Sequence, residues 1–147
     1  MSTDATGTAL AALDVLVGRW TSSGRTVARP GEPSIAITGT DTYEWLPGGH
    51  FLVHRVDVRV GEEQVDVLEV IGRDEDGTIA MRSFDHRGDS AVMHASVDAA
   101  GTWTFAGPAE RAQLVVAEDG RSMSARWERR AGNGWEHWMD MEFHRTA

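Results

Sequence analysis

The sequence predicts an all-β protein, a closed antiparallel barrel of about ten strands preceded by a short N-terminal helix. From Gly18 onward, apolar residues recur with the period of two that is typical of strands. Short segments such as Asp76-Gly77 and Gly132-Asn133-Gly134 separate the apolar runs and favour hairpin turns. Strands joined by such short turns run antiparallel, and a long series of them loses its exposed edges by closing into a barrel. A two-sheet sandwich is the alternative.

The N-terminal segment has a different periodicity from the rest of the chain. Leu10, Leu13 and Leu16 follow helical spacing, and either Thr6 or Thr8 could cap this helix. Residues 1–17 are therefore expected to form a tail and a short helix.

Ten runs rich in β-branched or aromatic residues follow the helix. They span residues 18–27, 34–45, 51–60, 65–73, 78–84, 91–97, 102–106, 112–117, 122–129 and 135–143.

Composition limits the classes of function. A length of 147 residues predicts one domain, 1–147, and a net charge of −9 argues against nucleic acid and anionic membrane partners. The chain has no lysine, which excludes Schiff-base chemistry, and the lack of cysteine excludes thiolate nucleophiles and disulfides. The apolar N-terminal stretch lacks the basic region of a signal peptide, so we expect a cytoplasmic protein, with a homodimer left open.

Several segments resemble known barrels. Leu16-Val17-Gly18-Arg19-Trp20, at the start of the first strand, is similar to the Gly-x-Trp signature of calycins, the lipocalin and fatty-acid-binding-protein superfamily. Residues 39–45, 48–53 and 71–74 resemble an uncharacterised bacterial family of calycin-like barrels, the domain of unknown function 1579. That resemblance spans nearly the whole chain and implies a barrel architecture, without catalytic residues to transfer.

The first strand is also similar to that of the nitrobindins, which begin with Gly-x-Trp-x-Gly-x-Gly-x-Gly and bind haem through a histidine on the last strand. Gly18, Trp20 and Gly24 match this motif, whereas Ser22 and Thr26 replace its second and fourth glycines. The resemblance implies that His137 would be the haem ligand. Haem is the single cofactor that we consider, and no other metal is expected.

Strands 34–45 and 51–60 each carry one polar residue on an otherwise apolar face. Asp41 shares its face with Ile35, Ile37, Tyr43 and Trp45, and His54 shares its face with Leu52, Val56, Val58 and Val60. A four-residue loop at 46–49 would make the following pairs: Trp45 with His50, Tyr43 with Leu52, Asp41 with His54, Gly39 with Val56, and Ile37 with Val58.

Opposed residues of this kind lie close enough for the Asp41 carboxylate to bond the His54 imidazole inside the barrel. Such a pair orients the ring for general-base catalysis. The alternative is a buried polar pair whose members simply satisfy each other.

Alternation along the last strand, 135–143, predicts that Trp135, His137 and Met139 point inward. The direction of Glu69 is undecided, because both faces of its strand are apolar. Five methionines share one alternating position on their strands: Met81, Met93, Met123, Met139 and Met141. If these faces all line the cavity, its wall is rich in methionine, and ordinary core packing is the alternative.

The leading hypothesis is the binding of a small, largely apolar molecule in the barrel cavity. The expected ligand-binding residues are Tyr43, Trp45, Leu52, Val56, Glu69, Trp135, His137 and Met139. Two alternatives stay open: a cofactor-free isomerase, cyclase or dehydratase that uses Asp41 and His54 as catalytic residues, and haem binding through His137.

Overall fold

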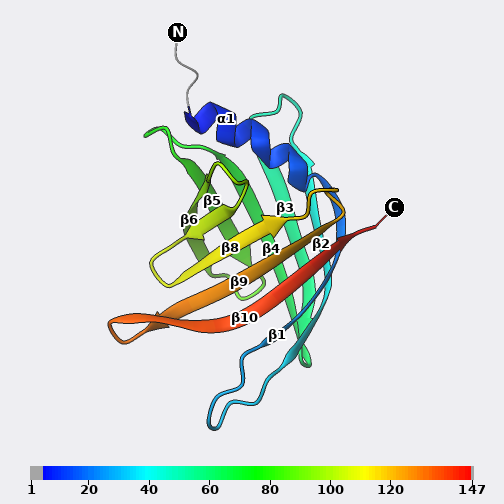
Figure 1. Ribbon diagram of the computed structural model, residues 1–147, viewed down its shortest axis with the longest axis vertical. Coiled ribbons are helices and arrows are strands. Elements are labelled where there is room, and N and C mark those ends of the chain that lie inside the picture. The colour runs from blue at the N-terminus through cyan, green and yellow to red at the C-terminus, as the bar shows by residue number, and fades with distance from the viewer. Residues whose placement is uncertain (1–4, 147) are drawn as a thin grey trace.

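The computed structural model of the protein describes residues 5–146 as one short helical segment followed by ten strands (Figure 1). The helical segment consists of the α-helix α1 (Ala5–Ala12) and the 3-10 helix η1 (Leu13–Leu16). The strands are β1 (Gly18–Thr26), β2 (Ala36–Trp45), β3 (Phe51–Val60), β4 (Glu63–Arg73), β5 (Ile79–Asp85), β6 (Ser90–Val97), β7 (Trp103–Ala106), β8 (Glu110–Val116), β9 (Ser122–Ala131) and β10 (Gly134–Arg145). Each strand begins and ends within two residues of its predicted position.

The ten strands form a closed antiparallel barrel in which each strand pairs with its neighbours along the chain. Closure comes from β1, which pairs with β2 on one side and with β10 on the other, Trp20 lying opposite Arg145. The closed barrel is therefore confirmed, and the two-sheet sandwich is excluded. Pairing β1 with β10 satisfies backbone groups that would be exposed edges in an open sheet.

The helical segment lies across one end of the barrel, which we call the helical end (Figure 1). Leu13 and Leu16 of η1 are buried in the core below it. The indole Nε1 of Trp45 donates a hydrogen bond of 2.9 Å to Asp14 Oδ1 and so ties the end of β2 to η1.

The helix starts earlier in the chain than its predicted caps. Thr6 and Thr8 lie inside α1, so neither is the expected N-cap of the described helix. Within residues 5–146, no helix is long and apolar enough to cross a membrane.

Trp20 explains the Gly-x-Trp sequence at the start of β1. Its side chain is fully buried, and its Nε1 donates to the carbonyl of Leu16 at 2.8 Å. The guanidinium of Arg145 lies 4.1 Å above the indole ring and donates to the carbonyl of Val17. A Cβ on Gly18 would lie 2.4 Å from Arg145 Nη1, and Gly18 has a φ of +133°, so a side chain does not fit there.

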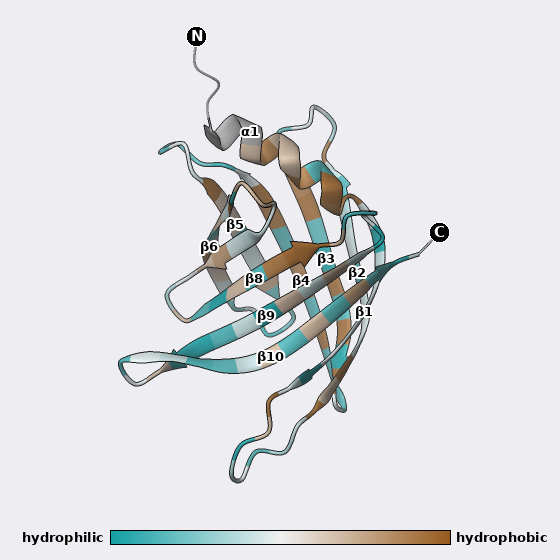
Figure 2. Cartoon of the chain, in the orientation of Figure 1, coloured by the Kyte–Doolittle hydropathy of each residue, from teal (hydrophilic) through white to brown (hydrophobic). Residues whose placement is uncertain are grey.

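Buried and exposed residues alternate along β2 and β3. Figure 2 shows hydrophobic and hydrophilic residues as brown and teal bands along the strands. On β3, Leu52, His54 and Val58 are buried, whereas Arg55 between them is exposed. The predicted faces of β2 and β3 are confirmed except for Ile35, which precedes β2 and is 40% exposed.

The register between β2 and β3 differs from the predicted one. Tyr43 pairs with His54, and Asp41 lies diagonally across from His54. The shift is two residues, so every inward residue keeps its face. The predicted pairs Trp45–His50, Tyr43–Leu52, Asp41–His54, Gly39–Val56 and Ile37–Val58 are wrong.

The hairpin loop causes this shift. It spans residues 47–50 and is closed by a 2.8 Å hydrogen bond from the Leu46 amide to the Phe51 carbonyl. Gly48 and Gly49 take φ angles of +106° and +74°, which favour glycine. His50 therefore belongs to the turn.

A β-bulge interrupts β10 between His137 and Met139. Over this step β10 advances by two residues while β9 advances by one, so Trp138 is the extra residue. Side chains before the bulge consequently change sides, and Trp135 and His137 turn outward, against the prediction.

Candidate functional site

The barrel encloses a cavity of about 730 Å³. Most of its wall is apolar. The apolar lining includes Ile37, Val56, Val58, Val60, Val65, Val67, Met81, Val92, Met93, Phe105, Leu114, Ala125, Trp127, Trp138, Met139, Met141 and Phe143. Four of the five methionines predicted for this wall are confirmed, whereas Met123 is buried without lining the cavity.

The cavity reaches the β3–β4, β5–β6 and β7–β8 turns, at the end of the barrel opposite α1. Glu63 and Arg87 line it there and are exposed on the surface. This is the end at which the cavity meets solvent, and we call it the open end.

One ionic network, which we call the His54 network, interrupts the apolar wall. It contains Ser22, Asp41, His54 and Glu69, which are all the buried polar residues in the described part of the chain. His54 Nε2 lies 2.6 Å from Asp41 Oδ2, and His54 Nδ1 lies 2.8 Å from Glu69 Oε1. Ser22 Oγ donates to Asp41 Oδ1 at 2.5 Å. The imidazole is thus held between two carboxylates.

Four adjacent strands supply this network, in the order β1, β2, β3 and β4. His54 lies directly opposite Glu69 across the β3–β4 ladder. Asp41 and Ser22 each reach diagonally to a neighbour, because their direct partners are Val56 and Gly39. Period-two patterning brings all four side chains inside.

Tyr43 packs against the His54 ring. Their ring centroids are 3.9 Å apart and their planes differ by 9°. Burial raises the pKa of the Tyr43 phenol well above its usual 10.0, and the nearby charges of Asp41 and Glu69 raise it further. Tyr43 therefore presents a neutral hydroxyl at neutral pH.

The charge of His54 is set by opposing effects. Burial alone would lower the pKa of His54, because it disfavours the charged imidazolium. Hydrogen bonds to Asp41 and Glu69, together with their negative charges, outweigh burial and raise the pKa from 6.5 to about 9. At neutral pH His54 is an imidazolium that donates from both nitrogens.

This geometry extends the predicted Asp41–His54 pair. Their side-chain contact is present despite the shifted register, and Glu69, whose direction was undecided, points inward as a third member. Tyr43, Val56 and Met139 also line the cavity as expected.

Two other predicted ligand-binding residues lie elsewhere. Leu52 is fully buried on the inward face of β3 but does not reach the cavity wall. Trp45 is half-buried at the helical end, where it bonds Asp14.

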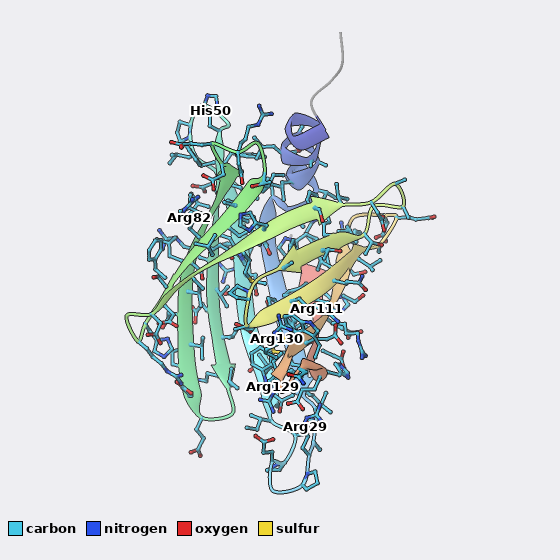
Figure 3. The ribbon with its side chains drawn as sticks, turned by 90° about the vertical axis from the view of Figure 1, so that its left-hand side faces the viewer. Arg29, His50, Arg82, Arg111, Arg129 and Arg130 are labelled. Atoms are coloured by element: carbon cyan, nitrogen blue, oxygen red, sulfur yellow. The ribbon has the colours of Figure 1, made fainter. Side chains whose placement is uncertain are left out.

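Trp135 lies on the outer surface of β10. The guanidinium groups of Arg111 and Arg130 lie over its ring at 4.4 and 4.3 Å from the centroid. Figure 3 shows both arginines on one side of the barrel, with Arg129 and Arg29 farther along it. Trp135 is therefore part of a surface cluster and not of the cavity.

His137 does not fit the haem ligand that the nitrobindin resemblance implies. Its Nε2 is hydrogen-bonded to Asp140 at 2.8 Å, and it is not among the cavity-lining residues. Within residues 5–146, no group of three or more His, Asp or Glu side chains is arranged to hold a metal ion.

Sequence reasoning missed Ser22 and Trp138. Ser22 shares a strand face with Trp20, two residues away, and this alternation could have placed it inside. Trp138 faces the cavity because of the bulge, for which the sequence carries no glycine or other signal that we recognise.

The fold and site together define a class of protein: a closed antiparallel β-barrel with an apolar cavity and one buried ionic network. The chain belongs to the family described as Protein of unknown function (DUF1579), whose sequence profile matches residues 6–84. The matched stretch runs from α1 to β5 and includes all four residues of the His54 network. The family suggested by the sequence is thereby confirmed.

Two solved structures are similar to this chain, and the first of them supports the fold. Rv2717c from M. tuberculosis superposes with a TM-score of 0.66 at 17% identity, over 95% of this chain and 98% of that chain. A de novo designed fluorescence-activating β-barrel gives a TM-score of 0.49 at 14% identity, over 99% of this chain and 100% of that chain. A search of curated proteins finds no match.

Proposed function

We propose that the protein binds a small, largely apolar molecule inside the barrel. The observation that carries this proposal is the cavity of about 730 Å³ with its mainly aliphatic, methionine and aromatic wall. Pockets for small molecules measure about 300–1,000 Å³ and combine an apolar lining with a few placed polar groups. The cavity has this size and composition.

The number of strands is consistent with an interior wide enough to hold a ligand. A barrel of about eight strands has a lumen that side chains can fill, and the diameter grows with the number of strands. This barrel has ten strands. Valine, alanine and methionine together outnumber the aromatic residues in its cavity lining, which leaves space at the centre.

The His54 network supports a fixed orientation of the bound molecule. It forms a polar region on the inner wall, and Tyr43 and Glu69 both line the cavity there. An apolar body would pack against the valines and methionines while one polar group meets the network.

The Asp41–His54 contact of 2.6 Å favours a second candidate, a cofactor-free acid–base enzyme. Both ring nitrogens already face carboxylates, however, so His54 has no free nitrogen with which to accept a substrate proton. This arrangement supports binding more strongly than general-base catalysis by His54.

A neutral fluorescent probe, N-phenyl-1-naphthylamine, tests the proposal. We expect its emission to rise on binding and to saturate at one probe per chain. Native mass spectrometry of protein taken directly from cells is expected to show a bound mass that organic solvent removes.

The matched variants are Val56→Trp, which narrows the cavity, and Arg55→Trp, which adds the same ring to the exposed outer face of β3. Probe affinity should fall by about tenfold in the first and stay unchanged in the second. Equal affinity in both, or no saturable binding to the unmodified protein, would contradict the proposal.

A further inference from the structure

We infer that the ligand carries a hydrogen-bond donor at its polar end, with a primary ammonium group as the best match, and that Glu69 Oε2 accepts from it. This inference rests on the proposed function, since it names the chemical class of ligand for the same cavity.

Three of the four carboxylate oxygens in the His54 network have a hydrogen-bond partner. Asp41 uses Oδ1 for Ser22 and Oδ2 for His54, and Glu69 uses Oε1 for His54. Within the described residues, Glu69 Oε2 has no hydrogen-bond partner. It is the one carboxylate oxygen of the network that is left open.

Glu69 lines the cavity although the residue is buried, at 9% exposure. In the part of the chain that the structure describes, no side-chain oxygen is both sealed from solvent and without a partner. Oε2 is therefore reached from the cavity, and a buried acceptor of this kind is stabilised when a donor arrives.

Two carboxylates and one imidazolium leave the His54 network with an excess of negative charge. An ammonium group would neutralise that excess through a charge-assisted hydrogen bond, whereas a carboxylate or phosphate group would be repelled.

The basic residues of the cavity wall do not reverse the preference for a cationic ligand group. These residues are His54, His86 and Arg87. His54 is engaged on both nitrogens, Arg87 is hydrogen-bonded to Glu63 at the open end, and His86 lies 3.5 Å from the same carboxylate. None of them is free to receive an anionic group at the inner wall.

The test is displacement of N-phenyl-1-naphthylamine by three compounds of equal chain length: dodecylamine, dodecanol and dodecanoate. At neutral pH we expect dodecylamine to bind tightest and dodecanoate weakest, with about tenfold between these two. This series uses the unmodified protein, so it does not depend on any variant folding.

The variant Glu69→Gln removes the charge and keeps the shape. We expect it to weaken dodecylamine binding by about tenfold while dodecanol binding changes by less than about threefold. Glu44→Gln removes the same charge from the exposed face of β2 and controls for general attraction of a cation to an acidic protein. It should leave all three affinities unchanged.

The outcomes separate the two proposals. If the probe binds but dodecanoate displaces it as well as dodecylamine does, or if Glu44→Gln weakens the amine as much as Glu69→Gln, the inference about the donor is overturned and the binding function stands. If neither the probe nor any of the three compounds binds, the binding function itself fails.

Discussion

Tyr43 lies flat against His54, with ring centroids 3.9 Å apart and planes 9° from parallel. The phenol ring supports the imidazolium face by a stacking contact with cation–π character. It also fixes the plane in which the two ring nitrogens point, one toward Asp41 on β2 and the other toward Glu69 on β4. The stacked pair and the two carboxylates therefore act as one unit. Its contribution to the free energy of unfolding can be measured with variants of its residues.

Replacement of His54 should destabilise the protein strongly. The variant His54→Gln leaves Asp41 and Glu69 as two buried carboxylates without the cation between them. Removing one partner of a buried ion pair costs about 3–5 kcal/mol. We expect a loss of that size in the free energy of unfolding by urea.

The control for this variant is His94→Gln, because His94 is exposed on β6. It should change the free energy of unfolding by less than about 0.5 kcal/mol. Similar small effects at both positions would show that the His54 network contributes little to stability.

Stability should fall as the pH rises from 6.5 to about 9. The pKa of His54 is raised from 6.5 to about 9 by folding, so the folded state binds a proton that the unfolded state has lost in this range. Its contribution is fully present below pH 6.5 and lost as the pH passes about 9. We expect a decrease of about 3 kcal/mol, measured by urea unfolding across this range.

The same pH series on His54→Gln provides the comparison, since that variant lacks the titrating group. Its profile should be flatter. A profile as steep as that of the unmodified protein would assign the pH dependence to other residues.

Arg145→Lys should loosen the helical end. Lysine keeps the charge but loses the flat guanidinium over Trp20 and the simultaneous hydrogen bonds to the carbonyls of Val15 and Val17. We expect a loss of about 1–3 kcal/mol in the free energy of unfolding. Arg126→Lys, on the exposed face of β9, should be neutral in the same urea titration.

The two neighbouring tryptophans of β10 should differ in their effect on binding. Trp138→Leu removes part of the cavity wall and should weaken N-phenyl-1-naphthylamine binding by about threefold to tenfold. Trp135→Leu alters the outer surface and should leave probe affinity unchanged. The reverse order would mean that the bulge does not orient β10 as described.

Periodicity was sufficient to predict the ten strands, the closed barrel and the inward direction of Asp41 and His54. It could not determine the β2–β3 register, because a shift of two residues leaves every face unchanged. The turn at Gly48 and Gly49 determines that register through its backbone conformation. The alternation of apolar and polar residues carries no information about this conformation.

The rest of the site depends on relations between distant strands. Glu69 joins His54 through the β3–β4 ladder, while the alternation on β4 is masked by apolar residues on both faces. The prediction that Trp135 and His137 point inward extends a period of two through Trp138, where β10 carries one extra residue. One local irregularity was enough to reverse the predicted direction of both.

The bulge in β10 also affects how this barrel is compared with others. The extra residue at Trp138 reverses the side of the sheet that each earlier residue of β10 faces, so inward positions become outward and outward positions become inward. An alignment of the final strand made without a gap at Trp138 would transfer ligand residues from another barrel onto side chains that face solvent here. The last strand should therefore be aligned by its side-chain directions, and only then by its sequence.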